Sequence, residues 1–195
     1  MQAFEYLLGL ASILIGIALA DMALSLHRLL RSEGPVRWHW HPIAAAVVVV
    51  LLVLDLWWGL RQLERAGVTM TVGLFLPLLA ALFVFFLLAA ATFPDKVSVK
   101  GTDLEVYYSA TSRYFWRLFS IYNMLSSAHV FAVGLAAPGW QTSSYQRLAV
   151  QFVPNMIIVG LAVSLSVSRR WWWHSVVLVF LLAALLMSHV ARPLN

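Results

Sequence analysis

The chain lacks cysteine altogether, which excludes disulfide bonds, thiolate metal sites and cysteine nucleophiles. It also lacks a phosphate-binding P-loop, a dinucleotide-binding glycine-rich turn and the metalloprotease pattern His-Glu-x-x-His. No Gly-x-Ser-x-Gly stretch offers a serine nucleophile. We therefore expect no catalytic site and predict that the protein is not an enzyme.

Charged residues are scarce, at 11% of 195 residues, whereas hydrophobic residues make up 62%. Soluble domains usually have about 25% charged residues. So little polar surface cannot cover a water-soluble globule, and the mean hydropathy of +0.85 agrees. We expect residues 1–195 to form a single membrane domain with the lipid bilayer around most of its surface.

The formal net charge is nevertheless +5. In a soluble protein this balance would suggest nucleic acid, but here the cations fall in short segments between apolar runs, where they set membrane topology. We expect no nucleic-acid partner. The only lysines, Lys96 and Lys100, lie outside the apolar runs, so no intramembrane lysine is present to hold retinal as a Schiff base.

Six apolar runs are long enough to cross a bilayer, which takes about 20 residues of helix. The sequence thus predicts an all-α, polytopic integral membrane protein, a bundle of six transmembrane helices with short connections. The predicted spans are Phe4–Leu30, Pro42–Leu60, Val68–Phe93, Tyr114–Ala137, Leu148–Ser168 and Trp171–Val190.

Basic residues are shared unequally between the two sides of this bundle. If the N-terminus lies outside, nine fall on the inner side and four on the outer side, and positive charge favours the cytoplasm. We expect both termini on the outer side, in the periplasm of a bacterial inner membrane. The nine are Arg28, Arg31, Arg37, Lys96, Lys100, Arg113, Arg117, Arg169 and Arg170; the four are Arg61, Arg65, Arg147 and Arg192.

All nine tryptophans fall near predicted span ends, which is typical of the aromatic belts at membrane–water interfaces. We assign Trp38, Trp40, Trp116 and Trp171–Trp173 to the inner belt, and Trp57, Trp58 and Trp140 to the outer belt.

Residues 94–113 are predicted to form a cytoplasmic loop with an interfacial helix. Thr102-x-x-Glu105 fits a capping box, so we expect a helix to begin near Asp103 and to run on into the fourth span. A plain loop with a separate short interfacial helix is the alternative.

Asp21 lies well inside the first span, where a carboxylate is costly unless it is paired. Ser25 and Arg28 follow at helical spacing, so a ladder within the helix is one interpretation, and Arg117 is another partner at similar depth. Asp21 would then be either half of a structural ion pair or part of a proton or cation site near the inner mouth.

The fourth span is the most polar one. Arg113, Arg117, Ser120, Asn123 and Ser127 recur every three to four residues, and Tyr122, Ser126 and His129 line a neighbouring face. Together they predict a polar sector that faces a cavity or the bundle interior. This sector is either part of a water-filled path or a row of interhelical hydrogen bonds.

His129 and His189 are both expected in the outer half, as is Asn155. Facing imidazoles could hold a b-type haem, or could relay protons with Asp55 or Glu5; otherwise the two histidines are hydrogen-bonded separately. No metal site is predicted, and His39-Trp40-His41 is interpreted as a polar loop in an aromatic belt.

Three hypotheses about function remain. The first is a homo-oligomeric ion or proton channel whose polar path runs along the fourth span; the second is a non-catalytic subunit that stabilises or assembles a larger membrane complex; the third is a haem-carrying electron-transfer protein. The first predicts an inner mouth at Asp21 and Arg117. The remaining path residues are Ser120, Asn123 and Ser127 in the middle and Asp55, His129 and His189 outside.

Overall fold

The computed structural model describes residues 2–65, 68–69, 71–136 and 142–190. It is all-α, and six helices lie in these ranges, as many as predicted. Five of them, α1, α2, α3, α4 and α6, are long and apolar enough to cross a membrane, whereas the apolar part of α5, Phe152–Val167, is shorter. The helices are α1 (Gln2–Leu30), α2 (Trp40–Arg65), α3 (Val72–Ala90), α4 (Leu104–Ala136), α5 (Thr142–Val167) and α6 (Trp171–Val190).

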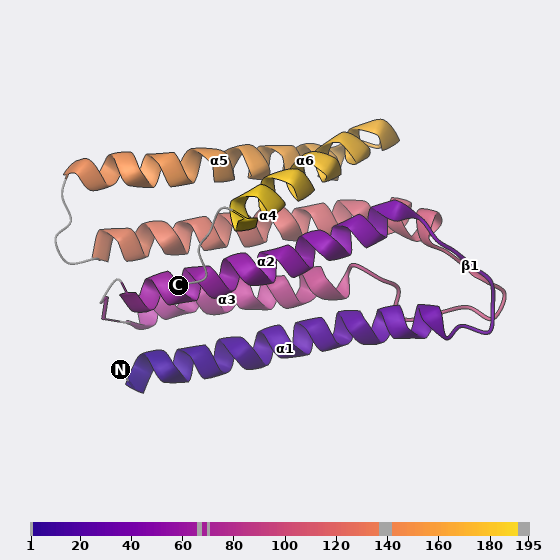
Figure 1. The fold of residues 1–195 in the computed structure, drawn as a ribbon, viewed down its shortest axis with the longest axis horizontal. Coiled ribbons are helices and arrows are strands. Elements are labelled where there is room, and N and C mark those ends of the chain that lie inside the picture. The colour runs from indigo at the N-terminus through magenta and orange to yellow at the C-terminus, as the bar shows by residue number, and fades with distance from the viewer. Residues whose placement is uncertain (1, 66–67, 70, 137–141, 191–195) are drawn as a thin grey trace.

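The helices are arranged in two layers (Figure 1). One layer runs α1–α3–α4–α5, because α3 packs against both α1 and α4, and α4 packs against α5. The other layer is the pair α2–α6, with α6 crossing the bundle diagonally (Figure 1). Chain direction alternates, so α1 begins and α6 ends towards the same end, which we call the N-terminal end. The opposite end is called the β end, after two short strands found there.

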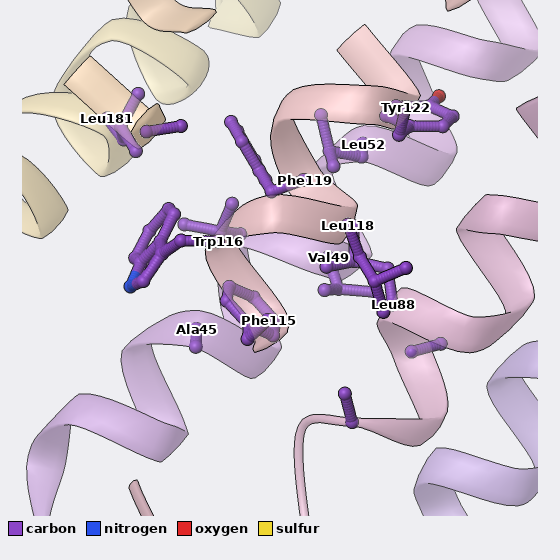
Figure 2. Close-up of a cluster of buried hydrophobic side chains, with 14 of the residues drawn as sticks. Ala45, Val49, Leu52, Leu88, Phe115, Trp116, Leu118, Phe119, Tyr122 and Leu181 are labelled. Carbon is purple, nitrogen blue, oxygen red and sulfur yellow. The ribbon is translucent and has the colours of Figure 1, made fainter. Parts of the chain in front are cut away.

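Large apolar side chains from both layers fill the middle of the bundle. Trp116, Phe119 and Phe85 are almost completely buried there, with Val49 of α2 and Leu181 of α6. Figure 2 shows Phe119 and Leu181 directed into the space between α4 and α6. The belt assignment of Trp116 was therefore wrong. Position near a span end does not reveal which face of the helix a residue occupies, and Trp116 is on the face that packs inward.

The second and third helices have other bounds than the sequence predicted. The second predicted span extends at both ends, from Trp40 to Arg65. The third begins at Val72 rather than Val68, because Thr71 is its N-cap: the Thr71 hydroxyl accepts a hydrogen bond from the backbone N–H of Leu74 at 3.4 Å.

The predicted helix near Asp103 is present and continuous with the fourth span, since α4 is one helix from Leu104 to Ala136. Its cap is not Thr102, however. The Asp103 carboxylate accepts from the backbone N–H groups of Glu105 (2.9 Å) and Val106 (3.3 Å). The Thr102 hydroxyl instead accepts from the N–H of Ser98, so the capping-box assignment was wrong by one residue.

Two strands that the sequence analysis did not predict join the α1–α2 and α3–α4 connections. β1 (Val36–Arg37) pairs in parallel with β2 (Thr102–Asp103), and Arg37 forms an ion pair with Asp103 at 2.9 Å. The connections approach so closely that a Cβ at Gly34 would lie 2.6 Å from the carbonyl oxygen of Val99. We call this pairing the clasp.

Some predictions concern parts of the chain that lie outside the described residues. These are the belt position of Trp140, the final residue of the fourth predicted span, Ala137, and the side of Arg192. The side chain of Arg147 is also outside the described set.

Asp103 both caps α4 and pairs with Arg37, so two substitutions at this position should lower the stability by different amounts. Asp103→Ala removes both the helix cap and the Arg37 ion pair, and should lower the free energy of unfolding in detergent by about 1–2 kcal/mol. Asp103→Asn keeps a capping oxygen and loses only an exposed ion pair, which is worth less than about 1 kcal/mol. Thermal unfolding of both variants measures this, and equal losses would contradict the capping role.

Candidate functional site

A cavity of about 560 Å³ lies in the N-terminal half of the bundle, which we call the chamber. Its wall comes from α2, α4, α5 and α6, with Leu78 added from α3. It extends along α2 from Leu52 to Leu63, or about 16 Å at 1.5 Å per residue. It forms where the diagonal course of α6 brings α6 against α2 and away from the N-terminal half of α5 (Figure 1).

The chamber wall is mostly apolar, with a limited set of polar side chains. Leucine and phenylalanine side chains dominate it, including Leu56, Phe131 and Phe152. The polar members come from four helices: Asp55 of α2; Tyr122, Asn123, Ser126, Ser127 and His129 of α4; Asn155 of α5; and Ser188 of α6. This combination is typical of sites for small amphipathic molecules.

A chain of hydrogen bonds fixes the α4 side of the chamber. The Asn123 amide donates to the carbonyl of Phe119 at 2.8 Å, and the Ser127 hydroxyl donates to the carbonyl of Asn123 at 2.7 Å. Asn155 of α5 then donates to the Ser127 oxygen. Ser127 thus both satisfies its own helix and ties α4 to α5.

Asp55 and His189 face each other on the opposite side. Nε2 of His189 lies 3.1 Å from the carbonyl oxygen of Leu51, and Nδ1 lies 4.0 Å from the Asp55 carboxylate. The His189 side chain is only 11% exposed, and its Nδ1 has no hydrogen-bond partner among the described residues. The pair therefore links α6 to α2 next to the chamber.

His129 occupies the α3 side of α4. It is 7% exposed, its ring hydrogen-bonds the backbone of Leu74, and its Nδ1 is buried without a hydrogen-bond partner in the described part of the chain. The N–H of Leu74 is directed at Thr71, so the carbonyl of Leu74 receives this bond. His129 is thus held by α3 while it lines the chamber.

The structure brings together five of the eight predicted path residues. Asp55, Asn123, Ser127 and His129 line the chamber, and His189 stands beside Asp55. The other three lie elsewhere. Arg117 is exposed although Ser120, Asn123 and Ser127 of the same predicted sector are buried, so the sector is narrower than expected.

Ser120 and Asp21 have separate surroundings. The Ser120 hydroxyl donates to the carbonyl of Trp116 at 2.8 Å. Asp21 lies half-buried on α1, outside the chamber. The ladder proposed for it is not formed, because the Ser25 hydroxyl has no hydrogen-bond partner among the described residues and Arg28 donates to the carbonyl of Asp95 at 3.3 Å.

The two histidines offer no support for a haem. A bis-histidine site needs both rings to present a nitrogen to the same iron. Here the ring of His129 bonds to the backbone of α3, and the ring of His189 bonds to the backbone of α2. This arrangement agrees with the separately bonded histidines that were the alternative.

The sequence analysis placed Tyr122 and Ser126 in the polar sector of the fourth span and Asn155 in the outer half, but did not count them among the path residues. It did not single out Ser188, although all four line the chamber. Asn155 had a usable signal, since an amide directly after Pro154 inside an apolar helix has to find a partner in the bundle. Ser188 carried no such signal, because a serine near a helix end is equally common at the surface.

A second polar cluster lies at the β end, where His39-Trp40-His41 is more than the polar loop expected. His41 is buried, stacks on His39, and places Nε2 3.1 Å from the Ser175 hydroxyl. The indole N–H of Trp116 donates to the Tyr108 hydroxyl at 3.1 Å. The Tyr108 hydroxyl in turn lies 3.0 Å from Nδ1 of His174. Within the described ranges, no group of three or more His, Cys, Asp or Glu side chains could hold a metal ion.

Comparisons with known proteins give no family model, no curated protein and no solved structure that matches this chain.

The Ser127 linkage predicts a difference between two serines of the chamber wall. Ser127→Ala leaves the half-buried Asn155 amide without this acceptor and should cost about 0.6–2 kcal/mol of stability. Ser188→Ala is the matched control, because the Ser188 hydroxyl donates to the carbonyl of Leu185 in its own helix, and its loss should be nearly neutral. Unfolding in detergent compares the two, and a neutral Ser127→Ala would rule out the linkage.

Proposed function

We propose that this chain is an integral membrane protein that binds a small amphipathic molecule in the chamber. One observation carries the proposal: a cavity of about 560 Å³ with a mostly apolar wall and a few polar groups from four helices. Small-molecule sites have volumes of about 300–1,000 Å³ and this kind of lining. The five helices long and apolar enough to cross a membrane supply the membrane setting.

The proposed orientation puts the N-terminal end, and with it the chamber, on the outer side. It rests on the basic residues of the β end, among them Arg28, Arg31, Arg37 and Arg113, which are exposed there. Positive charge of this kind favours the cytoplasmic side. In a bacterium, the chamber would then lie in the outer half of the inner membrane, with both termini periplasmic.

Blocking the chamber tests this function. Ala184 lines it, whereas Ala183, its neighbour on α6, is exposed on the outside of the bundle. Ala184→Phe should fill part of the volume and abolish binding of a fluorescent amphipathic probe to the purified protein in lipid nanodiscs. Ala183→Phe adds the same side chain to the lipid-facing side and should bind as wild type does. Equal binding by both variants would contradict the proposal.

Ion or proton conduction is a second candidate, favoured by the contact between His189 and Asp55 and by the polar row of α4. Histidine and carboxylate side chains inside a helical bundle are common members of proton pathways. Against a path within one chain, the buried side chains of Trp116, Phe119 and Leu178 fill the bundle between the chamber and the β end. Conduction would therefore call for a homo-oligomer or a rearranged bundle.

Flux measurements separate the two candidates. Proteoliposomes that hold only this chain and an internal pH-sensitive dye receive an imposed proton, K⁺ or Na⁺ gradient. Conduction predicts flux that Asp55→Asn abolishes and Asp21→Asn, outside the chamber, retains. Folded protein that conducts nothing in any gradient would remove the second candidate. A non-catalytic subunit of a larger complex then remains as the alternative to binding, and co-purifying chains would identify it.

A further inference from the structure

The hydrogen-bond donors of the chamber wall are directed to acceptors within the protein. The amide of Asn123 and the hydroxyls of Ser127 and Ser188 each donate to a backbone carbonyl of their own helix. Tyr122 and Ser126 hydrogen-bond to each other, which uses one of their two hydroxyl hydrogens. A molecule in the chamber therefore meets few N–H or O–H groups.

The orientation of Asn155 follows from the same bonds. Because the Ser127 hydrogen already goes to the carbonyl of Asn123, the Ser127 oxygen can only accept, and Asn155 must turn its amide nitrogen towards it. The amide oxygen of Asn155, an acceptor, and the second hydrogen of its amide nitrogen are then left for other partners on a residue that lines the chamber.

The backbone also determines the tautomers of both histidines. A carbonyl oxygen cannot donate, so the carbonyl of Leu51 requires the hydrogen of neutral His189 to be on Nε2. The carbonyl of Leu74 requires the same of His129. In both rings Nδ1 is therefore a lone-pair acceptor, and both Nδ1 atoms are buried without a partner among the described residues.

The negative charge of Asp55 lies beside one of these acceptors. Nδ1 of His189 is 4.0 Å from the Asp55 carboxylate, so two electron-rich groups face each other in a mostly apolar surrounding. A positive group that carries hydrogens would be attracted by the Asp55 carboxylate, which lines the chamber, and could donate a hydrogen bond to it. A carboxylate or phosphate would be repelled by the same wall.

We infer that the chamber selects molecules with a protonated amine attached to an apolar body; this inference rests on the binding function proposed above. The ammonium group lies by Asp55, which is next to His189, and its N–H hydrogens donate to the Asp55 carboxylate. The apolar body lies against the leucine and phenylalanine side chains of the wall. Anionic amphiphiles are excluded by charge, and neutral alcohols can donate to the carboxylate but lack the attraction between opposite charges.

Three probes with one ring system test this selectivity: pyrenemethylamine, pyrenemethanol and pyrenecarboxylate. Their dissociation constants are measured by fluorescence with the full chain in nanodiscs of zwitterionic lipid near neutral pH. The wild type should bind the amine at least about tenfold more tightly than the alcohol, since only the amine adds an attraction between opposite charges to its hydrogen bond, and it should bind the carboxylate most weakly. Asp55→Asn should remove the preference, and Asp21→Asn, a matched loss of charge outside the chamber, should keep it.

The outcomes separate this inference from the binding function. If the wild type binds all three probes equally and Ala184→Phe binds none, the chamber binds amphiphiles and the inferred selectivity is wrong. If Ala184→Phe binds every probe as the wild type does, the chamber is not the site and both fail. A preference for the amine that survives in folded Asp55→Asn overturns the inference. If that variant does not fold, the ratio of amine to alcohol in the wild type decides alone.

Discussion

This structure depends on one constraint. Polar side chains inside an apolar bundle must find hydrogen-bond partners within the protein. Water cannot supply those hydrogen bonds, so the protein has to. On α4 the solution is local, because Ser120, Asn123 and Ser127 each donate to the carbonyl one turn earlier. A helix with this much polarity can therefore occupy the centre of its layer, between α3 and α5. The same bonds use up donors and leave acceptors, which gives the chamber its chemical character.

The helices were predictable because the property that forms them is local. An apolar run of sufficient length reveals a helix without reference to the rest of the chain, and α1 and α6 match their predicted spans almost residue for residue. The buried position of Asn123 and Ser127 also follows locally, since their spacing puts them on one face. Asp55 and His189 could be ranked only by depth, and their contact needed the fold.

The features missed from the sequence depend on how helices meet. To predict the burial of Trp116, one has to know which face of α4 turns inward. The clasp pairs only two residues from each of two distant connections, which is too few to give a strand pattern in the sequence. Arg117 was predicted to face the bundle interior because it has the same spacing as Ser120, Asn123 and Ser127, yet its side chain is exposed. The chamber wall includes residues of α6, which crosses the bundle diagonally (Figure 1). The direction in which a helix crosses the others cannot be predicted from its own sequence.

The place of α6 in the chain has a consequence for biogenesis. Ribosomes deliver the helices in order, and α6 follows all the others described here. It supplies Leu181, Leu185 and Ser188 to the chamber wall and His189 beside Asp55. The earlier helices can associate through α1–α3–α4–α5 before it arrives, but the chamber cannot exist until then. The chamber wall is thus complete only after α6 has packed against α2.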